Sequence, residues 1–225
     1  INLADFITAS KRWGRIPMAN RAIDLPLTAV LQLHVPRLAA REVRLARPDQ
    51  GTMPRTARTK SSITTGNLKV IGLDGRDEFS SSDANRIEGT LLVDLGGGDN
   101  TLTLDDTVAL KSVELRVGSG VDDVDVGDSQ VDGNLKVFLG GVPAGTPDTF
   151  DMGNCQIGGN LSVSSTAVSN VNTFSLQVMR TLSLAFDSGD NEVDLSNTIA
   201  RKFKVMTGAG ADNVDFDGGS VAKTD

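Results

Sequence analysis

Cysteine and histidine each occur only once in the 225 residues, as Cys155 and His34. A single cysteine excludes a disulfide framework, and this pair is too small for the clusters of ligands that hold zinc. His34 has no cysteine or acidic constellation around it in the sequence. Cys155 lies in the segment GNCQIGG, just before an aliphatic residue, which predicts a small buried or turn residue rather than a nucleophile.

Aromatic residues and long apolar runs are also scarce. There is one Trp and no Tyr, and aromatic residues make up 4% of the chain. No run of 18 apolar residues is present, which argues against a membrane span. The apolar segment 25–35 is interrupted by Gln32 and His34 and is a poor secretion signal. The glycine-rich segment LGGGDNTLTL has no lysine and no helix after it, so it does not predict a phosphate-binding loop.

Charge is divided unevenly along the chain. Residues 1–60 contain 11 Lys and Arg against 4 Asp and Glu, a net charge of +7, whereas residues 61–225 contain 11 against 25, a net charge of −14. This contrast indicates two differently built segments. The acidic part would repel phosphate groups, which argues against nucleic acid as a partner.

The dominant pattern is a repeat with a period of about 22 residues. Each copy has alternating apolar residues, a glycine-rich turn, a second alternating pair, a polar turn and a lone aliphatic residue. The first apolar position of the seven copies is Leu68, Leu91, Val113, Leu135, Leu161, Leu182 and Phe203. Steps of 21 to 26 residues separate these positions, which indicates stacked coils.

Each copy offers three inward edges, because alternation with period two is typical of strands with one buried face. The second pair begins at Phe79, Leu102, Val124, Phe150, Phe174, Val193 and Val214. The lone aliphatic is Ile87, Val131, Ile157, Val178, Ile199 and Val221, with an ambiguous register near 108–110 in the second copy. The pattern predicts an all-β fold, a right-handed parallel β-helix of about seven coils with three short strands per coil, over residues 66–225.

Residues 1–65 form a separate basic extension in this interpretation. Leu27, Leu31 and Val35 recur at helical spacing, and a second short helix is predicted over 36–48, beginning near Pro36. Residues 49–62 have the composition of a linker. The extension is either partly helical, with a helix that caps the first coil, or disordered. Two copies depart from the repeat: the fourth inserts VPAGTPDT between its strands, and the fifth replaces the glycine turn with STAVSNVN. Insertions in solenoids are frequent sites of function.

Four turns share the frame G-x-G-x-D/N-x-U, namely LDGRDEF, GGGDNTL, GSGVDDV and GAGADNV, and DSGDNEV is a weaker copy. This frame resembles the calcium-binding nonapeptide of the repeats-in-toxin family. The resemblance implies calcium between stacked turns. Its side-chain ligand positions fall on Asp77, Asn100, Asp122, Asn191 and Asp212, and its backbone-carbonyl positions fall on Gly96, Gly98, Gly118, Gly120, Gly208 and Gly210. The chain departs from the family in its coil of about 22 residues, with one such turn per coil, and in its two Asn ligands.

A second acidic feature lies on the outward positions of the second strands. These positions are Ser80, Thr103, Asp125, Asp151, Ser175, Asp194 and Asp215. Asp125 would stack on Asp151 and Asp194 on Asp215, so salt or divalent cations are expected to stabilise the fold.

The sequence therefore predicts a non-catalytic secreted or cell-surface module of a bacterial adhesin or matrix protein, with calcium as the expected ligand. Surface polysaccharide or another protein is the expected partner, and the chain is expected to continue into further repeats or to pack end to end. The alternative is a polysaccharide lyase or hydrolase, with a cleft at residues 140–150 lined by Asp148 and Asp151. A crystal-binding threonine ladder begins at Thr101 and Thr103, but aspartates follow in later copies.

Overall fold

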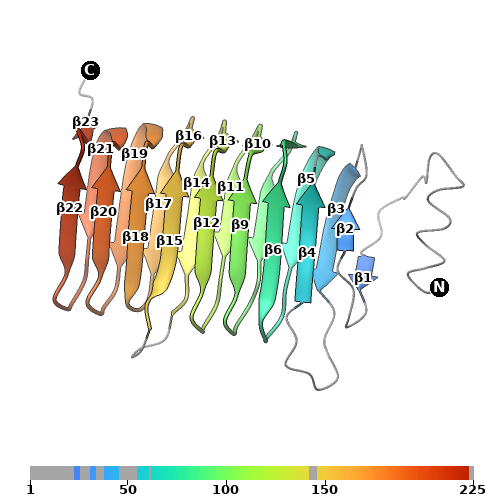
Figure 1. Cartoon of the computed structure of the whole chain (residues 1–225), viewed down its shortest axis with the longest axis horizontal. Coiled ribbons are helices and arrows are strands. Elements are labelled where there is room, and N and C mark those ends of the chain that lie inside the picture. The colour runs from blue at the N-terminus through green and yellow to red at the C-terminus, as the bar shows by residue number, and fades with distance from the viewer. Residues whose placement is uncertain are drawn as a thin grey trace, which may run out of the picture.

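The computed structural model describes residues 23–25, 31–33, 38–45, 55–60, 62–141 and 146–222. These residues form strands joined by turns, with no helix in the described ranges. All strand pairs are parallel, and the chain winds into a β-solenoid of about seven turns (Figure 1). The all-β parallel β-helix predicted from the repeat is confirmed. Within the same ranges, no helix has the length and apolar character needed to cross a membrane.

Sheet B, seen at the front of Figure 1, contains the second strand of each coil. Its strands are β2 (Leu31–Leu33), β4 (Arg55–Lys60), β6 (Asp77–Ser82), β9 (Thr101–Asp105), β12 (Asp123–Gly127), β15 (Asp148–Gly153), β18 (Ser169–Phe174), β20 (Glu192–Ser196) and β22 (Asn213–Asp217). They are hydrogen-bonded in this order, so neighbours in the sheet lie one coil apart in the sequence.

Sheet A contains the other two edges of each coil. One row is β8 (Leu91–Asp94), β11 (Val113–Arg116), β14 (Leu135–Leu139) and β17 (Leu161–Ser165); the shorter row is β7 (Asn85–Ile87), β10 (Thr107–Ala109), β13 (Gln130–Val131) and β16 (Gln156–Ile157). Three long strands, β5 (Ile63–Ile71), β19 (Gln177–Phe186) and β21 (Ile199–Met206), run through both rows. The remaining strands are β1 (Ile23–Leu25), β3 (Leu38–Leu45) and β23 (Val221–Ala222). Three edges per coil are thus confirmed.

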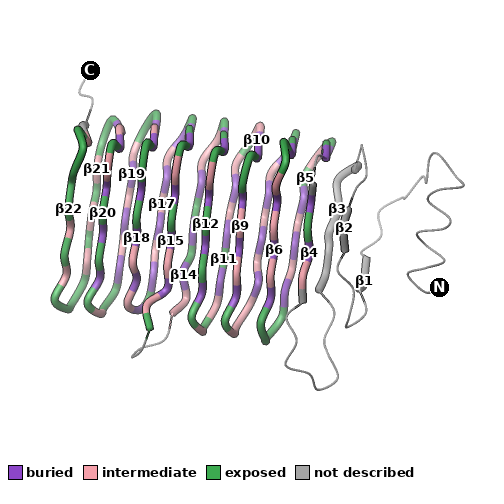
Figure 2. Tube along the Cα trace, in the orientation of Figure 1, coloured by how far each residue is buried: buried purple, intermediate pink, exposed green. Residues whose placement is uncertain are grey.

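Like residues stack on like residues inside the solenoid. Val124 of β12 pairs with Leu102 of β9 and with Phe150 of β15, and all three are fully buried. The alternation of buried and less buried residues is visible along every central strand in Figure 2. Because each coil covers the apolar side chains of its neighbours, stability is shared along the stack.

Two register predictions are wrong. In the fifth coil, Val171 pairs with Phe150 and Val193 at the inward position, whereas Phe174 is 54% exposed. The apolar pattern gave the wrong register because Thr173 occupies an inward position that is aliphatic in other coils. The hydroxyl oxygens of Thr173 and Thr198 are 2.7 Å apart, so each buried hydroxyl has a hydrogen-bond partner. In the last coils, Val178 pairs with Ala200 rather than with Ile199.

The ambiguous register of the second coil is resolved. Ala109 pairs with Ile87 and Val131 at the lone inward position and is fully buried. The smaller side chain at this edge explains why the apolar pattern around residues 108–110 was difficult to align.

Both helical predictions for the extension are also wrong, because residues 31–33 form strand β2 and residues 38–45 form strand β3. Val43 of β3 pairs with Val70 of β5, so the segment joins the stack of coils. The sequence REVRL alternates with period two as well as fitting a helix, and pairing with β5 selects the strand. Strand β4, within the predicted linker, pairs with β6. The rest of the extension and residues 142–145 of the fourth-coil insertion lie outside the described residues.

Candidate functional site

The acidic and amide side chains of the glycine turns point into the solenoid and form a ladder. Asp77, Asn100, Asp122 and Asn191 are at most 2% exposed. The backbone N–H of each rung donates to a side-chain oxygen one coil further on: Asp77 N to Asn100 Oδ1 (3.0 Å), Asn100 N to Asp122 Oδ1 (2.8 Å) and Asn191 N to Asp212 Oδ1 (3.0 Å). The five predicted ligand positions therefore share one row, which we call the Asx ladder.

Two rungs of the Asx ladder were missed by the sequence analysis. Asp148 accepts from the backbone N–H of Asp122 (3.0 Å), and the backbone N–H of Ser169 donates to Asn191 Oδ1 (3.1 Å). Both rungs are fully buried, in the two coils whose turns depart from the glycine frame. A signal was present, because Asp148 precedes the inward Phe150 by two residues, as Asp122 precedes Val124.

The amide groups of the asparagine rungs bind backbone carbonyls of the turns, and those bound by Asn100 are carbonyls that the resemblance assigned to calcium. Asn100 Nδ2 donates to the carbonyls of Gly96 (3.1 Å) and Gly98 (2.6 Å), and also to Asp122 Oδ1 (2.9 Å). In the same way, Asn191 Nδ2 donates to the carbonyl of Gly189 (2.9 Å). The amide nitrogen thus takes the place at the turn carbonyls that a bound cation would take.

The turn glycines are required by the backbone path and by close stacking. Gly98 has a φ of +107°, and a Cβ there would lie 2.5 Å from the carbonyl oxygen of Gly75. A Cβ on Gly118 would lie 2.4 Å from the carbonyl oxygen of Gly96. The remaining predicted glycines also have positive φ: Gly96, Gly120, Gly208 and Gly210. These constraints explain the glycine frame without a metal.

Asp122 and Asp148 are consecutive acidic rungs, and one oxygen of each has no partner. Neither Asp122 Oδ2 nor Asp148 Oδ2 has a hydrogen-bond partner among the described residues, although both atoms are buried. Burial, opposed by hydrogen bonds from Asn100 and aided by the charges of Asp148 and Asp99, raises the pKa of Asp122 to about 7. Burial also raises the pKa of Asp148. Over the described ranges, no three His, Cys, Asp or Glu side chains are grouped to hold a metal ion.

Two further polar ladders line the other corners of the solenoid. At one, Thr107 N donates to Ser129 Oγ (3.1 Å), and Cys155 Sγ donates to the carbonyl of Gly153 (3.0 Å). Cys155 is buried, and this burial raises the pKa of its thiol to about 11. The prediction of a small buried residue at this position is confirmed. At the third corner, Asn160 N donates to Asn134 Oδ1 (2.8 Å).

The outward face of sheet B carries an aligned row of acidic side chains, which we call the acidic row. Its members, in register on successive coils, are Asp125, Asp151, Asn172, Asp194 and Asp215. The predicted stacking of Asp125 on Asp151 and of Asp194 on Asp215 is confirmed. In the fifth coil the member is Asn172 rather than the predicted Ser175, because the register there differs by three residues.

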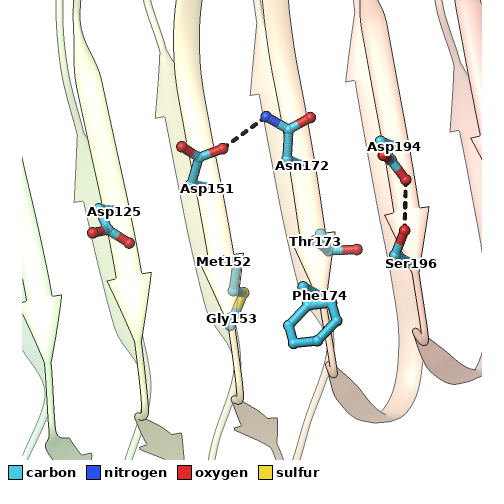
Figure 3. A pocket seen from close by; sticks show the side chains of 9 residues that line it. All are labelled: Asp125, Asp151, Met152, Gly153, Asn172, Thr173, Phe174, Asp194 and Ser196. Atoms are coloured by element: carbon cyan, nitrogen blue, oxygen red, sulfur yellow. Dashed lines mark hydrogen bonds between the residues drawn. The ribbon is translucent and has the colours of Figure 1, made fainter.

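The acidic row borders a shallow hollow of about 430 Å³ (Figure 3). Asn172 Nδ2 donates to Asp151 Oδ1 (2.8 Å), which separates two carboxylates along the row, and the exposed ring of Phe174 lies beside it. Burial, and then the charge of Asp151, raises the pKa of Asp125. The hollow therefore combines carboxylates that repel one another with one apolar surface.

Asp148 and Asp151 do not line a common cleft. They lie on opposite faces of β15, with Asp148 fully buried and Asp151 exposed. The side chains of a strand alternate between its faces, so residues three apart point in opposite directions. The pair expected for the alternative enzyme is therefore not brought together.

Comparison of the chain with protein-family models, with curated proteins and with solved structures finds no match.

Proposed function

We propose that this chain is a non-catalytic, secreted or cell-surface solenoid module with a structural or adhesive role, and that its acidic row binds calcium. The observation that supports the proposal is the alignment of Asp125 with Asp151 and of Asp194 with Asp215 on neighbouring coils. Parallel neighbours lie about 4.8 Å apart, and two carboxylates at that distance repel by roughly 1 kcal/mol even in water. A divalent cation between them would remove this repulsion.

The chemistry of the donors favours calcium over transition metals, because every charged donor in the row is an oxygen. Two carboxylates with water as the remaining ligands would give weak sites, with dissociation constants on the order of 10⁻⁴–10⁻³ M, as in extracellular modules. Calcium at such sites would stiffen the stack outside the cell. The resemblance to the repeats-in-toxin turns supports the same ion, but the acidic row offers it exposed carboxylates.

Thermal unfolding followed by circular dichroism tests the proposal, with millimolar calcium, matched magnesium or excess chelator. We expect calcium to raise the midpoint more than magnesium does, and the variant D125N/D151N/D194N/D215N, which removes both carboxylate pairs, to lose most of this rise. The turn variant D212N is the matched control and should keep it. Loss of the rise in D212N alone would place the ion at the turns, and no rise in the wild type would refute calcium binding.

A polysaccharide lyase or hydrolase is the second candidate, favoured by the hollow beside Asp151, Asp194 and the ring of Phe174. Paired carboxylates and an aromatic platform are what sugar hydrolysis uses. Incubation with acidic and neutral polysaccharides tests it: release of oligosaccharides by the wild type but not by D151N or D194N would support an enzyme. Equal release by all three would indicate a contaminant and refute this candidate.

A further inference from the structure

From β6 onward, acidic residues predominate on sheet B and basic residues on sheet A. The preceding strand of sheet B, β4, is basic, and its Arg58 pairs with Glu78. From β6 to β22, the strands of sheet B carry nine acidic residues that are not buried and no Lys or Arg: Glu78, Asp105, Asp123, Asp125, Asp151, Glu192, Asp194, Asp215 and Asp217. The strands of sheet A from β5 to β21 carry eight basic residues against two acidic ones. The basic residues are Lys69, Arg86, Arg116, Lys136, Arg180, Arg201, Lys202 and Lys204, and the acidic ones are Asp94 and Glu114.

The two faces also match in spacing. On sheet A, Lys136 and Lys204 lie in one outward row, three coils apart, through Ser162 and Ser183. On sheet B, Asp151 and Asp215 are three coils apart through Asn172 and Asp194. Both intervals are therefore about 14 Å, from the 4.8 Å separation of parallel strands. The two lysines on sheet A are therefore separated by the same distance as the two aspartates on sheet B.

Exposed apolar side chains accompany the charges on both faces. Phe138, 39% exposed, and Met206, 47% exposed, lie on outward positions of sheet A, and the guanidinium of Arg116 lies 5.1 Å from the centre of the Phe138 ring. Phe174 is the exposed apolar side chain beside the hollow on sheet B. Aromatic residues and arginine are typical anchors of protein interfaces.

We propose that the outer face of sheet B docks on one edge of sheet A of a second copy of this chain, the edge that contains β8, β11, β14 and β17 and carries Lys136 and Lys204. The inference rests on the proposed structural role and concerns the same acidic face. The contact is heterologous, because each copy offers two different faces, so it propagates into open chains of molecules rather than closing as a symmetric dimer. A lateral stack of solenoids is the assembly that a structural module would build.

The expected contact is modest and sensitive to salt. Seven strands about 4.8 Å apart and about 17 Å long give roughly 560 Å² per face, or roughly 1,100 Å² for both, near the lower limit for specific interfaces. Charge complementarity must supply much of the specificity in an interface of this size. The screening length falls from about 10 Å at 0.1 M salt to about 3 Å at 1 M, so high salt should separate the copies.

Sedimentation velocity of the full chain, over a range of concentrations at low and at 1 M salt, tests the proposal. The variants are D151K/D215K, which reverses the charge at two acidic positions of sheet B, and K136E/K204E, which reverses the charge at two basic positions of sheet A. We expect the wild type to associate at low salt, and each double variant alone to have an association constant at least about tenfold lower. Mixing the two variants should restore association, because a basic face then meets an acidic face.

The control is D132K/K111E, which reverses two charges at exposed corner residues without changing the net charge, and it should associate like the wild type. Circular dichroism of each variant shows whether it folds, and the mixing result does not depend on the unmixed variants being as stable as the wild type. A monomeric wild type at low salt, or no rescue on mixing, would overturn the inference. Calcium binding is measured separately at low salt on K136E/K204E, which keeps the acidic row but should not self-associate, so failure of self-association and failure of the proposed calcium function are distinguishable.

Discussion

Replacing Asp122 with asparagine should stabilise this protein at neutral pH, although the change removes a charge from a buried acidic rung. In the wild type, the pKa of Asp122 is raised from 3.8 to about 7, mainly by burial and in part by Asp148. Asn100 shows what an asparagine does at an equivalent rung: its Nδ2 donates to the carbonyl of Gly98 and to the carboxylate of the next rung. An asparagine at 122 would present the same donor to the turn and to Asp148.

The magnitude follows from proton linkage. The folded state holds a proton on Asp122 between about pH 4 and pH 7 that the unfolded state has released, so the free energy of unfolding falls as the pH rises through this window. A shift of about three units at 1.36 kcal/mol each sets a ceiling of about 4 kcal/mol, which is fully lost above pH 7. We expect Asp122→Asn to recover about 2–4 kcal/mol at pH 8 and almost nothing at pH 4.

Urea unfolding of the wild type, Asp122→Asn and the exposed control Asp123→Asn at several pH values between 4 and 8 measures the effect. Because solenoids can unfold in parts, coincident transitions in far-UV circular dichroism and in hydrodynamic radius should first establish that one transition is being compared. A wild type whose stability does not fall between pH 4 and pH 8 would refute the reasoning. So would an Asp122→Asn variant that is no more stable than Asp123→Asn at pH 8.

Three further predictions concern the ladder, the core and the thiol. Asn100→Ala leaves a buried backbone N–H and a turn carbonyl without partners and should cost about 2–5 kcal/mol in urea unfolding, whereas a cost below about 0.5 kcal/mol would mean that water replaces the side chain. Phe150→Ala should cost about 3–5 kcal/mol and Phe174→Ala under about 1 kcal/mol, and similar large costs for both would favour the register predicted from sequence, in which both rings point inward. Cys155 should resist alkylation at pH 8 until urea unfolds the chain, because its thiol is buried and its pKa is raised to about 11; rapid labelling of the folded protein would contradict its position.

Much of the fold could be predicted because the 22-residue period and the alternation of apolar residues both indicate stacked coils whose strands bury one face. Leu102, Val124 and Phe150 were placed on one inward row by spacing alone, and they stack in register. The errors arose where a polar residue occupies an inward position, as Thr173 does. Hydroxyl pairing with Thr198 satisfies that residue, but partner distances across coils cannot be obtained from a linear pattern.

The candidate site could be located more easily than interpreted. The glycine frame placed Asp77, Asn100 and Asp122 on one corner, which is where the ladder runs. What the sequence could not give is the direction of these side chains, because ligands of a cation and rungs of a hydrogen-bonded ladder share the same residue types and spacing. A donor atom distinguishes them: Asn100 Nδ2 contacts the turn carbonyls directly.

The alternation of the strands therefore decides which aspartates can act on other molecules. Asp122 and Asp125 are three residues apart, yet one is buried in the Asx ladder and the other is exposed on the acidic row. Inward carboxyl groups form hydrogen bonds between neighbouring coils, so their substitution should change the free energy of unfolding. Outward carboxyl groups are aligned by the stacking of the coils but take no part in the ladder. Their substitution should therefore change the affinity for cations or for a second copy. The ladder thus fixes the spacing that makes the acidic row match the basic face.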